Sequence, residues 1–354
     1  MKTIEICAGA GGQALGLHEA GMQHVALVEN DPYACETLET NNRIHELGWG
    51  EIFSRDLEEF IQERASEFAG EIDLVAGGVP CPPFSDGGLK RGKEDERDLF
   101  PAALDLVEIV RPFAVMIENV DGLMDSKFDS YRAEIQGRLS AMGYGSEWQK
   151  LFASEFGVPQ LRPRSILVAL PEEDFLHFSW PKPSVETPPT VGEALYEQMA
   201  ANGWEGASEW RENAKSIAPT IVGGSKKHGG PDLGPTRAKH AWKALGVNGH
   251  RIANEDEVPG PGFMGAPMRG GGIREGFERM PQLTLQMVAK LQGFPDYWVF
   301  SGRKTHAYRQ IGNAFPPPVA KAVGLKIHES FSRAKQLSHD TSTGLSDHSA
   351  VAAE

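Results

Sequence analysis

The sequence is short of cysteine. Its 354 residues include three cysteines, Cys7, Cys35 and Cys81, all within the first quarter of the chain. No Cys-x-x-Cys pair or Cys/His cluster has the spacing of a zinc site, and so few thiols do not make a disulfide framework. We therefore expect neither a structural metal nor disulfide bonds.

Long apolar stretches are absent too. No uninterrupted apolar run approaches the roughly 18 residues that cross a bilayer. The N-terminus also lacks the basic start and apolar run of a secretory signal. These absences predict a soluble cytoplasmic protein. Its length, with 40% apolar and 24% charged residues, allows a large core and two domains.

Positive charge is scarce overall but concentrated locally. The formal net charge of -14 argues against a protein that coats nucleic acid indiscriminately. Residues 1–100 carry 20 acids against 8 bases, whereas 215–251 and 301–335 each carry seven bases against a single acid. Basic segments in an acidic protein favour a polyanion held along one face. A merely solvated basic surface is an equally good interpretation of the charge alone.

Four short apolar runs alternate with helix-like stretches, at 3–7, 25–28, 72–76 and 114–117. This is the pattern of βαβ units around a parallel sheet. Ligands bind beyond the carboxyl ends of such strands. The residues that follow the four runs are therefore expected to share one rim of the sheet.

The first run leads into a glycine-rich turn. Gly9, Gly11 and Ala14 match the relaxed pattern G-x-G-x-x-G/A, and the acid Glu29 follows about 20 residues on. In adenosine-containing cofactor sites such an acid binds the ribose hydroxyls. A dehydrogenase cofactor and S-adenosylmethionine fit this turn equally well, and glycine-rich turns also arise for packing alone.

Cys81 lies in a proline-stiffened loop. The segment 77–88, GGVPCPPFSDGG, follows the third run and has prolines on both sides of the thiol. Each ring fixes its own φ and pushes the preceding residue toward extended geometry, while the glycines let another molecule approach closely. The loop favours an aimed nucleophile, and a small buried side chain is the alternative.

Charged side chains accompany two further runs. Glu118 follows the run 114–117, where it is either a functional acid or a helix cap. Arg162 and Arg164 precede the run 166–170, and in an extended chain they would point to the same side. Two arginines beside a thiol and a carboxylate would form an anion-binding site.

These motifs resemble those of the DNA cytosine-5 methyltransferases of bacterial restriction-modification systems, in the family's unpermuted order along nearly the whole chain. Pro80-Cys81 resembles the nucleophile loop, Glu118-Asn119-Val120 the acid motif, Gln160-x-Arg162-x-Arg164 the arginine motif, Gln310-Ile311-Gly312-Asn313 the motif that returns to the cofactor, and Leu283-Thr284 with Leu291-Gln292-Gly293-Phe294-Pro295 the segment that buttresses the recognition domain. The resemblance implies a Rossmann-like α/β sheet that uses S-adenosylmethionine, with a smaller, irregular target-recognition domain.

The resemblance also implies a role for each catalytic residue. Cytosine C5 is a poor nucleophile, so the Cys81 thiolate, aimed by Pro80, adds to C6 and makes C5 able to take a methyl group. A protonated Glu118 near N3 offsets the negative charge that develops there. Arg164 steadies the base and a nearby phosphate, and Arg162 supports the loop. Because the target atoms are unreachable inside a duplex, the cytosine is flipped out.

Contacts to the cofactor, and to the product S-adenosylhomocysteine, are implied for the turn residues Cys7, Gly9, Gly11 and Gly12, for Glu29 on the ribose, for Asn30, for Asp56 on the adenine amine, and for Leu99, Asn313 and Ala314. Two of these positions depart from the family pattern. Cys7 replaces an adenine-stacking phenylalanine, and Asn30 stands where an aromatic is frequent. Cofactor affinity is therefore expected to be lower or to rest on other apolar contacts.

Four segments are expected along the chain: a catalytic cofactor-binding domain at 1–172, a target-recognition domain at 173–280, a segment at 281–335 that returns to the catalytic domain, and a disordered tail at 336–354. Contacts to double-stranded DNA are expected from Ser85, Gln160, Lys226, Lys227 and Arg237. A flexible surface loop is the alternative for the Gly/Lys-rich stretch around Lys226.

A monomer is expected, with any cognate endonuclease acting separately. Three rival interpretations fit less of the sequence. A tRNA-modifying branch shares the catalytic motifs but is marked by a Cys-Phe-Thr segment, whereas this chain has no cysteine after Cys81. A dinucleotide-dependent oxidoreductase leaves Cys81, Glu118 and the paired arginines unexplained. A DNA-binding regulator without catalysis has no need of an intact nucleophile and acid.

Overall fold

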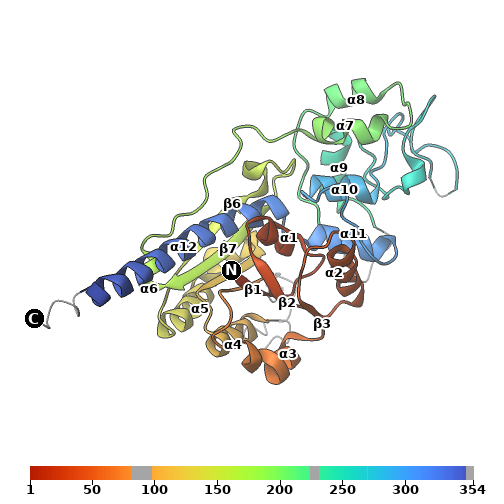
Figure 1. The fold of residues 1–354 in the computed structure, drawn as a ribbon. Helices are drawn as coiled ribbons and strands as arrows, with labels where there is room; N and C mark the ends of the chain where they lie inside the picture. Colours follow the sequence, from red (N-terminus) through yellow and green to blue (C-terminus); the bar gives the residue numbers. More distant parts are fainter. Residues whose placement is uncertain (81–97, 224–230, 269, 348–354) are drawn as a thin grey trace, which may run out of the picture.

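The computed structural model describes residues 1–80, 98–223, 231–268 and 270–347, with side chains to 337, around a seven-stranded sheet in the order β3-β2-β1-β4-β5-β7-β6 (Figure 1). The strands are β1 (Lys2–Ile6), β2 (Gln23–Glu29), β3 (Glu51–Ser54), β4 (Leu74–Gly77), β5 (Ala114–Val120), β6 (Tyr144–Phe152) and β7 (Pro163–Pro171). β1 to β5 pair in parallel, and β7 is antiparallel to both neighbours. The predicted α/β sheet is confirmed.

The four predicted runs correspond to β1, β2, β4 and β5, and the run 166–170 lies in β7. β3 and β6 are not apparent from the sequence. Both lie at edges of the sheet, and each mixes buried side chains with partly or fully exposed ones. A half-exposed strand does not form a continuous apolar run, so the pattern that reveals the central strands misses these two.

Helices cover both faces of the sheet (Figure 1). They are α1 (Gly12–Glu19), α2 (Pro32–Ile44), α3 (Leu57–Arg64), α4 (Phe100–Val110), α5 (Asp129–Ala141), α6 (Glu172–Phe175), α7 (Val191–Ala200), α8 (Ala207–Asn213), α9 (Thr236–Ala244), α10 (Leu285–Leu291), α11 (Lys304–Asn313) and α12 (Pro317–Asp347). On β4, Val75 packs in one core with α3, α4 and α5, while Leu74 and Ala76 pack in another with α1 and α12. Burial on both faces explains the apolar runs of the central strands.

A group of helices, α7 to α10, lies to one side of the sheet (Figure 1). Its core contains Trp204, Trp210 and Trp242, and it includes Met287 of α10. The residues after 280 therefore help to close the core of the region predicted as the recognition domain. The domain limits at 172 and 280 stay predictions.

The C-terminal region differs from the sequence-based expectation. α12 continues to Asp347, so the prediction of a disordered tail from 336 is wrong for 336–347. The polar composition of this stretch obscured the helix, because a chain continuing from a packed helix needs no apolar face of its own to extend a few turns. Within the described ranges, no helix is both long and apolar enough to span a membrane.

Candidate active site and cofactor cleft

The glycine-rich turn between β1 and α1 leaves no room for side chains at two positions. Gly11 has a left-handed φ of 81° and caps α1, and a Cβ there would lie 2.8 Å from Leu38 Cδ2. A Cβ on Gly12 would lie 2.3 Å from the carbonyl oxygen of Phe315. The turn needs glycine because α2 and the segment before α12 pack directly against it.

Glu29, at the end of β2, closes the turn from the neighbouring strand. Its Oε2 accepts the Gly9 N–H at 2.7 Å, and its Oε1 accepts the N–H groups of Asn30 and Asp31 at 2.9 and 2.8 Å. Burial raises the pKa of the Glu29 carboxyl, and the three backbone donors act in the opposite direction. Glu29 thus lies against the glycine-rich turn, as their spacing in the sequence predicts.

Two adjoining cavities extend from this turn. The first, of about 200 Å³, lies between the turn and α11, and the second, of about 220 Å³, lies between β2 and Leu99. Both are lined by Cys7, Glu29 and Gly78. Of the predicted cofactor residues, Cys7, Gly9, Gly12, Glu29, Asn30, Leu99, Asn313 and Ala314 line one or both cavities. The two cavities adjoin at Cys7, Glu29 and Gly78, and together they are called the cleft below.

The remaining predicted cofactor residues lie at the margin of the cleft. Gly11 is part of the turn without lining either cavity, and Asp56 lies 3.4 Å from the Asn30 side-chain nitrogen, at the N-terminus of α3. Cys7 has a positive φ of 50°, and burial together with the charge of Glu29 raises the pKa of its thiol. Cys7 is therefore a neutral, apolar element of the cleft wall.

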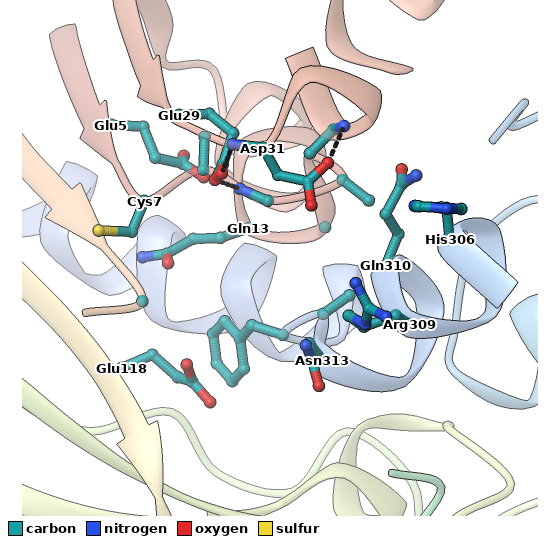
Figure 2. A pocket seen from close by; sticks show the side chains of 18 residues that line it. Glu5, Cys7, Gln13, Glu29, Asp31, Glu118, His306, Arg309, Gln310 and Asn313 are labelled. Carbon is teal, nitrogen blue, oxygen red and sulfur yellow. Dashed lines mark hydrogen bonds between the residues drawn. The ribbon is translucent and has the colours of Figure 1, made fainter. Parts of the chain in front are cut away.

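Glu118 faces the first cavity from the opposite side (Figure 2). It lies within β5 rather than after it, so the alternative of a helix cap is wrong. Its Oε1 is 2.7 Å from Arg164 Nε, an ion pair in which the N–H bond is not aligned with the oxygen, and both side chains are 10% exposed. Burial raises the pKa of the Glu118 carboxyl, although Arg164 and then Arg162 act to lower it.

Pro80 directly precedes the predicted nucleophile, Cys81, and it lies close to the strand that carries Glu118. Pro80 lines the second cavity and accepts the Leu99 N–H at 3.5 Å, while the Asn119 side chain donates to Val79 O at 2.9 Å. The chain therefore enters the segment that begins with Cys81 at the edge of the cleft, beside β5. Cys81, Ser85, Lys226 and Lys227 themselves lie outside the described residues.

Arg162 has different hydrogen-bond partners from Arg164. Its φ is 31°, so the predicted extended chain is wrong at this residue, although the charges of Arg162 and Arg164 both act on Glu118. The fully buried guanidinium donates to the carbonyl oxygens of Ile221, Gly312 and Ala314 at 2.6, 2.8 and 2.7 Å. Arg162 therefore ties the start of β7 to the region of α7–α9 and to the end of α11.

Gln160 belongs to the same buried junction. It is 0% exposed, its Oε1 accepts the Ile221 N–H at 2.8 Å, and its Nε2 donates to Leu291 O and Gln292 Oε1 at 3.0 and 2.8 Å. Both of its N–H donors and its carbonyl oxygen thus bond to protein groups. The prediction that Gln160 contacts DNA is wrong in this structure. Arg237, by contrast, is exposed in the first turn of α9.

Replacing Arg162 with methionine tests this structural role. The change removes three charge-assisted hydrogen bonds and leaves buried carbonyl groups unpaired, so we expect the free energy of unfolding to fall by about 3 kcal/mol. Urea unfolding followed by tryptophan fluorescence measures it. Arg162→Lys, which keeps the charge but loses the planar set of donors, should lie between. A loss below about 1 kcal/mol for both variants would contradict the role.

Several residues of the first cavity were not predicted from the sequence, among them Gln13, Asp31, His306 and Arg309. Asp31 caps α2 through the N–H groups of Tyr33 and Ala34, and an acid directly before a proline was a readable signal. His306, Arg309 and Asn313 follow helical spacing on α11. Their common face could have been inferred from Asn313.

The basic segments are partly neutralised within the protein. Lys239 pairs with Asp232 at 2.6 Å, and Lys321 pairs with Glu19 at 3.1 Å. The charge counted along the sequence therefore overstates what these segments offer to a polyanion. That they hold DNA stays a prediction.

Comparisons with known proteins agree with this geometry. A family model described as C-5 cytosine-specific DNA methylase matches residues 1–329. The chain is 50% identical over 328 residues to the Type II methyltransferase M.NaeI of Lentzea aerocolonigenes, covering 92% of this chain and 74% of that protein. It is 46% identical over 327 residues to the Type II methyltransferase M.NgoMIV of Neisseria gonorrhoeae, covering 92% and 96%. Its fold is similar to that of the Entamoeba histolytica methyltransferase EhMeth, with a TM-score of 0.62, 12% identity, and coverage of 94% and 98%. The chain belongs to the C-5 cytosine-specific DNA methylase family.

Proposed function

We propose that this DNA cytosine-5 methyltransferase binds S-adenosylmethionine in the cleft beside β1 and β2 and methylates a flipped-out cytosine within a specific double-stranded sequence. The observation that carries the proposal is that Glu118, in its ion pair with Arg164, faces the same cavity as the Gly9–Gly12 turn. Glu118, which could contact the cytosine ring, and the turn, which could bind a nucleoside cofactor, thus line the same cavity.

The residues of the cleft fit such a cofactor. Glu29 can accept the ribose hydroxyls, and Val28, Leu57 and Leu99 give the second cavity an apolar wall for adenine. Gln13 lines the first cavity, and its Nε2 is buried without a hydrogen-bond partner, a donor suited to a ligand oxygen. Leu57 and Leu99 would supply the apolar contacts expected in place of an aromatic at Cys7. When bound, S-adenosylmethionine supplies a methyl group activated by its sulfonium.

The chain's own groups account for the activation of the base. The Cys81 thiolate forms a bond to C6 of cytosine, and the electron pair moves toward N3, where protonated Glu118 donates a hydrogen bond. After C5 is methylated, a base takes the C5 proton, the electron pair of that bond re-forms the C5–C6 double bond, and the bond between sulfur and C6 breaks, which restores the ring and frees the thiolate. Arg164 holds Glu118 in place and offers its remaining donors to the base and a phosphate.

The biological setting that we propose is restriction-modification in the cytoplasm, with the enzyme acting as a monomer and the endonuclease acting separately. The support is the identity to two proteins named Type II methyltransferases. A direct test is to expose unmethylated DNA to the purified protein and S-adenosylmethionine and to sequence the methylated cytosines. Methylation confined to one short motif supports the proposal. Absence of methylated cytosine, or methylation without a motif, contradicts it.

A double substitution tests whether the Gly/Lys-rich segment contacts DNA. If Lys226 and Lys227 contact phosphates, Lys226→Ala with Lys227→Ala should weaken binding and reduce the slope of log K against log salt by about 1 to 2. Fluorescence anisotropy over a salt series measures this slope. Lys2→Ala with Lys127→Ala removes the same charge outside both basic segments and should leave the slope unchanged. Equal slopes for the wild type and the Lys226/Lys227 variant would exclude the contact.

A further inference from the structure

Two buried tryptophans pack behind the glycine-rich turn. A Cβ on Gly11 would lie 3.1 Å from Trp298 Cζ2 and 3.5 Å from Trp49 Cη2, and the ring centroids of the two tryptophans are 6.1 Å apart. Both side chains are buried, and neither lines the cleft. The two indoles therefore pack in a similar way against the side of the turn that faces away from the cleft.

The indole N–H groups of the two tryptophans differ in their partners. Trp298 Nε1 donates to Ala10 O at 3.1 Å. Trp49 Nε1 is buried without a hydrogen-bond partner among the residues that the structure describes. Ala10 belongs to the turn, is buried and lines the first cavity. Of these two indoles, the one from Trp298 thus bonds to the backbone of the proposed cofactor site.

Trp298 is itself held in place by backbone hydrogen bonds. Its own backbone N–H donates to Pro295 O at 3.0 Å. The next residue, Val299, donates its N–H to Asn41 Oδ1 at 3.0 Å, and its carbonyl oxygen accepts from Asn41 Nδ2 at 2.7 Å. These bonds fix the segment after α10 against α2, so the indole N–H of Trp298 has a defined position behind the turn.

The bond from Trp298 holds one end of the peptide group between Ala10 and Gly11. The other end, the Gly11 N–H, donates to Ala8 O at 3.0 Å. Glycines stand on both sides of Ala10, with φ of 54° at Gly9 and 81° at Gly11, and they allow this peptide group to rotate. A buried carbonyl without a donor is unfavourable. Without the indole N–H, the Ala10 carbonyl would therefore turn toward solvent in the first cavity.

We propose that Trp298 is a positioning residue for the cofactor. Its indole N–H holds the Ala10 carbonyl out of the first cavity and keeps the turn in the conformation that binds the nucleoside. The inference rests on the proposed cofactor cleft and adds a residue that does not line it. If the turn must be reoriented before it binds, the apparent affinity falls with the fraction of molecules in the competent conformation. Loss of the bond should therefore weaken cofactor binding without slowing methyl transfer itself.

The test compares the same change at the two tryptophans. Trp298→Phe keeps an aromatic ring but removes the N–H, and Trp49→Phe removes an N–H that has no partner. Isothermal titration calorimetry measures binding of S-adenosylhomocysteine. We expect the dissociation constant to rise by about 3- to 10-fold for Trp298→Phe and by less than about twofold for Trp49→Phe. For Trp298→Phe, KM for S-adenosylmethionine should rise by a similar factor, with kcat within about twofold of the wild type.

A second replacement removes the N–H without loss of volume. Incorporation of 3-benzothienylalanine in place of Trp298 puts a sulfur atom where the indole has its N–H. This protein should bind S-adenosylhomocysteine about 3- to 10-fold more weakly than the wild type. Unchanged binding would overturn the proposal, even if Trp298→Phe weakens it, because the loss would then come from packing.

The other results also have a definite meaning. If the wild type does not bind S-adenosylhomocysteine, the proposed function fails. If the wild type binds it and the two phenylalanine variants lose affinity equally, the cleft stands and the role of the Trp298 N–H is wrong. If Trp298→Phe unfolds at a lower temperature but binds S-adenosylhomocysteine as tightly as the wild type, the bond stabilises the fold alone, and the proposal is again overturned.

Discussion

Cys81→Ser is expected to abolish methyl transfer, with a fall in kcat of about 10⁴-fold or more. A serine hydroxyl at neutral pH is a far weaker nucleophile than a thiolate, so C6 is not attacked and C5 is not activated. DNA binding should change little, because the exchange of sulfur for oxygen leaves the phosphate contacts in place. Radiolabelled methyl transfer and DNA binding by anisotropy measure the two effects on the same preparation.

Cys35→Ser is the matched control for the loss of a thiol. Cys35 is buried, and its Sγ contacts Glu29 O at 3.3 Å, so its sulfur faces the protein backbone. This variant should retain most of the activity. Turnover by Cys81→Ser at the wild-type rate would contradict the assignment of the nucleophile.

Glu118→Gln is expected to lower kcat by about 10²- to 10³-fold. The amide keeps the shape of the side chain but, as a much weaker acid, donates a weaker hydrogen bond to the negative charge at N3, and it weakens the pairing with Arg164. Single-turnover methylation measures the chemical step. Binding of S-adenosylhomocysteine should remain within about threefold of the wild type, because the acid faces the base.

The pH dependence gives this prediction a second readout. Burial raises the pKa of the Glu118 carboxyl, and in the proposed mechanism the protonated form is the one that donates to N3. Activity should therefore hold below that raised pKa and fall as the pH passes above it. The Glu118→Gln variant should lack this alkaline limb. A limb of equal position in both enzymes would assign the titration to another group.

The central sheet was predictable because its strands are buried on both faces. β4 places Leu74 and Val75 in different cores, and such strands appear as apolar runs. β6 was not predictable in the same way, since an antiparallel edge strand mixes buried Trp148 with exposed Glu147. The C-terminal end of α12 could not be predicted from the spacing of apolar residues either. Its last turns are polar, and they continue a helix that packs against the core earlier, at Val319 and Val323.

Site residues were predictable from the sequence where the chemistry requires a particular residue type. They were less predictable where the packing of the chain decides which groups a side chain contacts. Glu118 and Glu29 were found as acids near strand ends, and they line one cavity. Gln160 and Arg162 belong to the same motif, yet the side chains of both form hydrogen bonds with buried backbone groups of the protein. Arg309 was counted only as charge, because its place on the cavity wall depends on how α11 packs against the turn.

The most direct measurement of the central claim uses DNA in which the target cytosine, once located by sequencing, is replaced by 5-fluorocytosine. Fluorine cannot leave C5 as a proton does, so the bond between Cys81 and C6 should persist after methylation. We predict a protein–DNA complex that survives denaturing electrophoresis, forms with S-adenosylmethionine, and is absent for Cys81→Ser. No such complex from an enzyme that methylates the ordinary sequence would contradict the covalent mechanism.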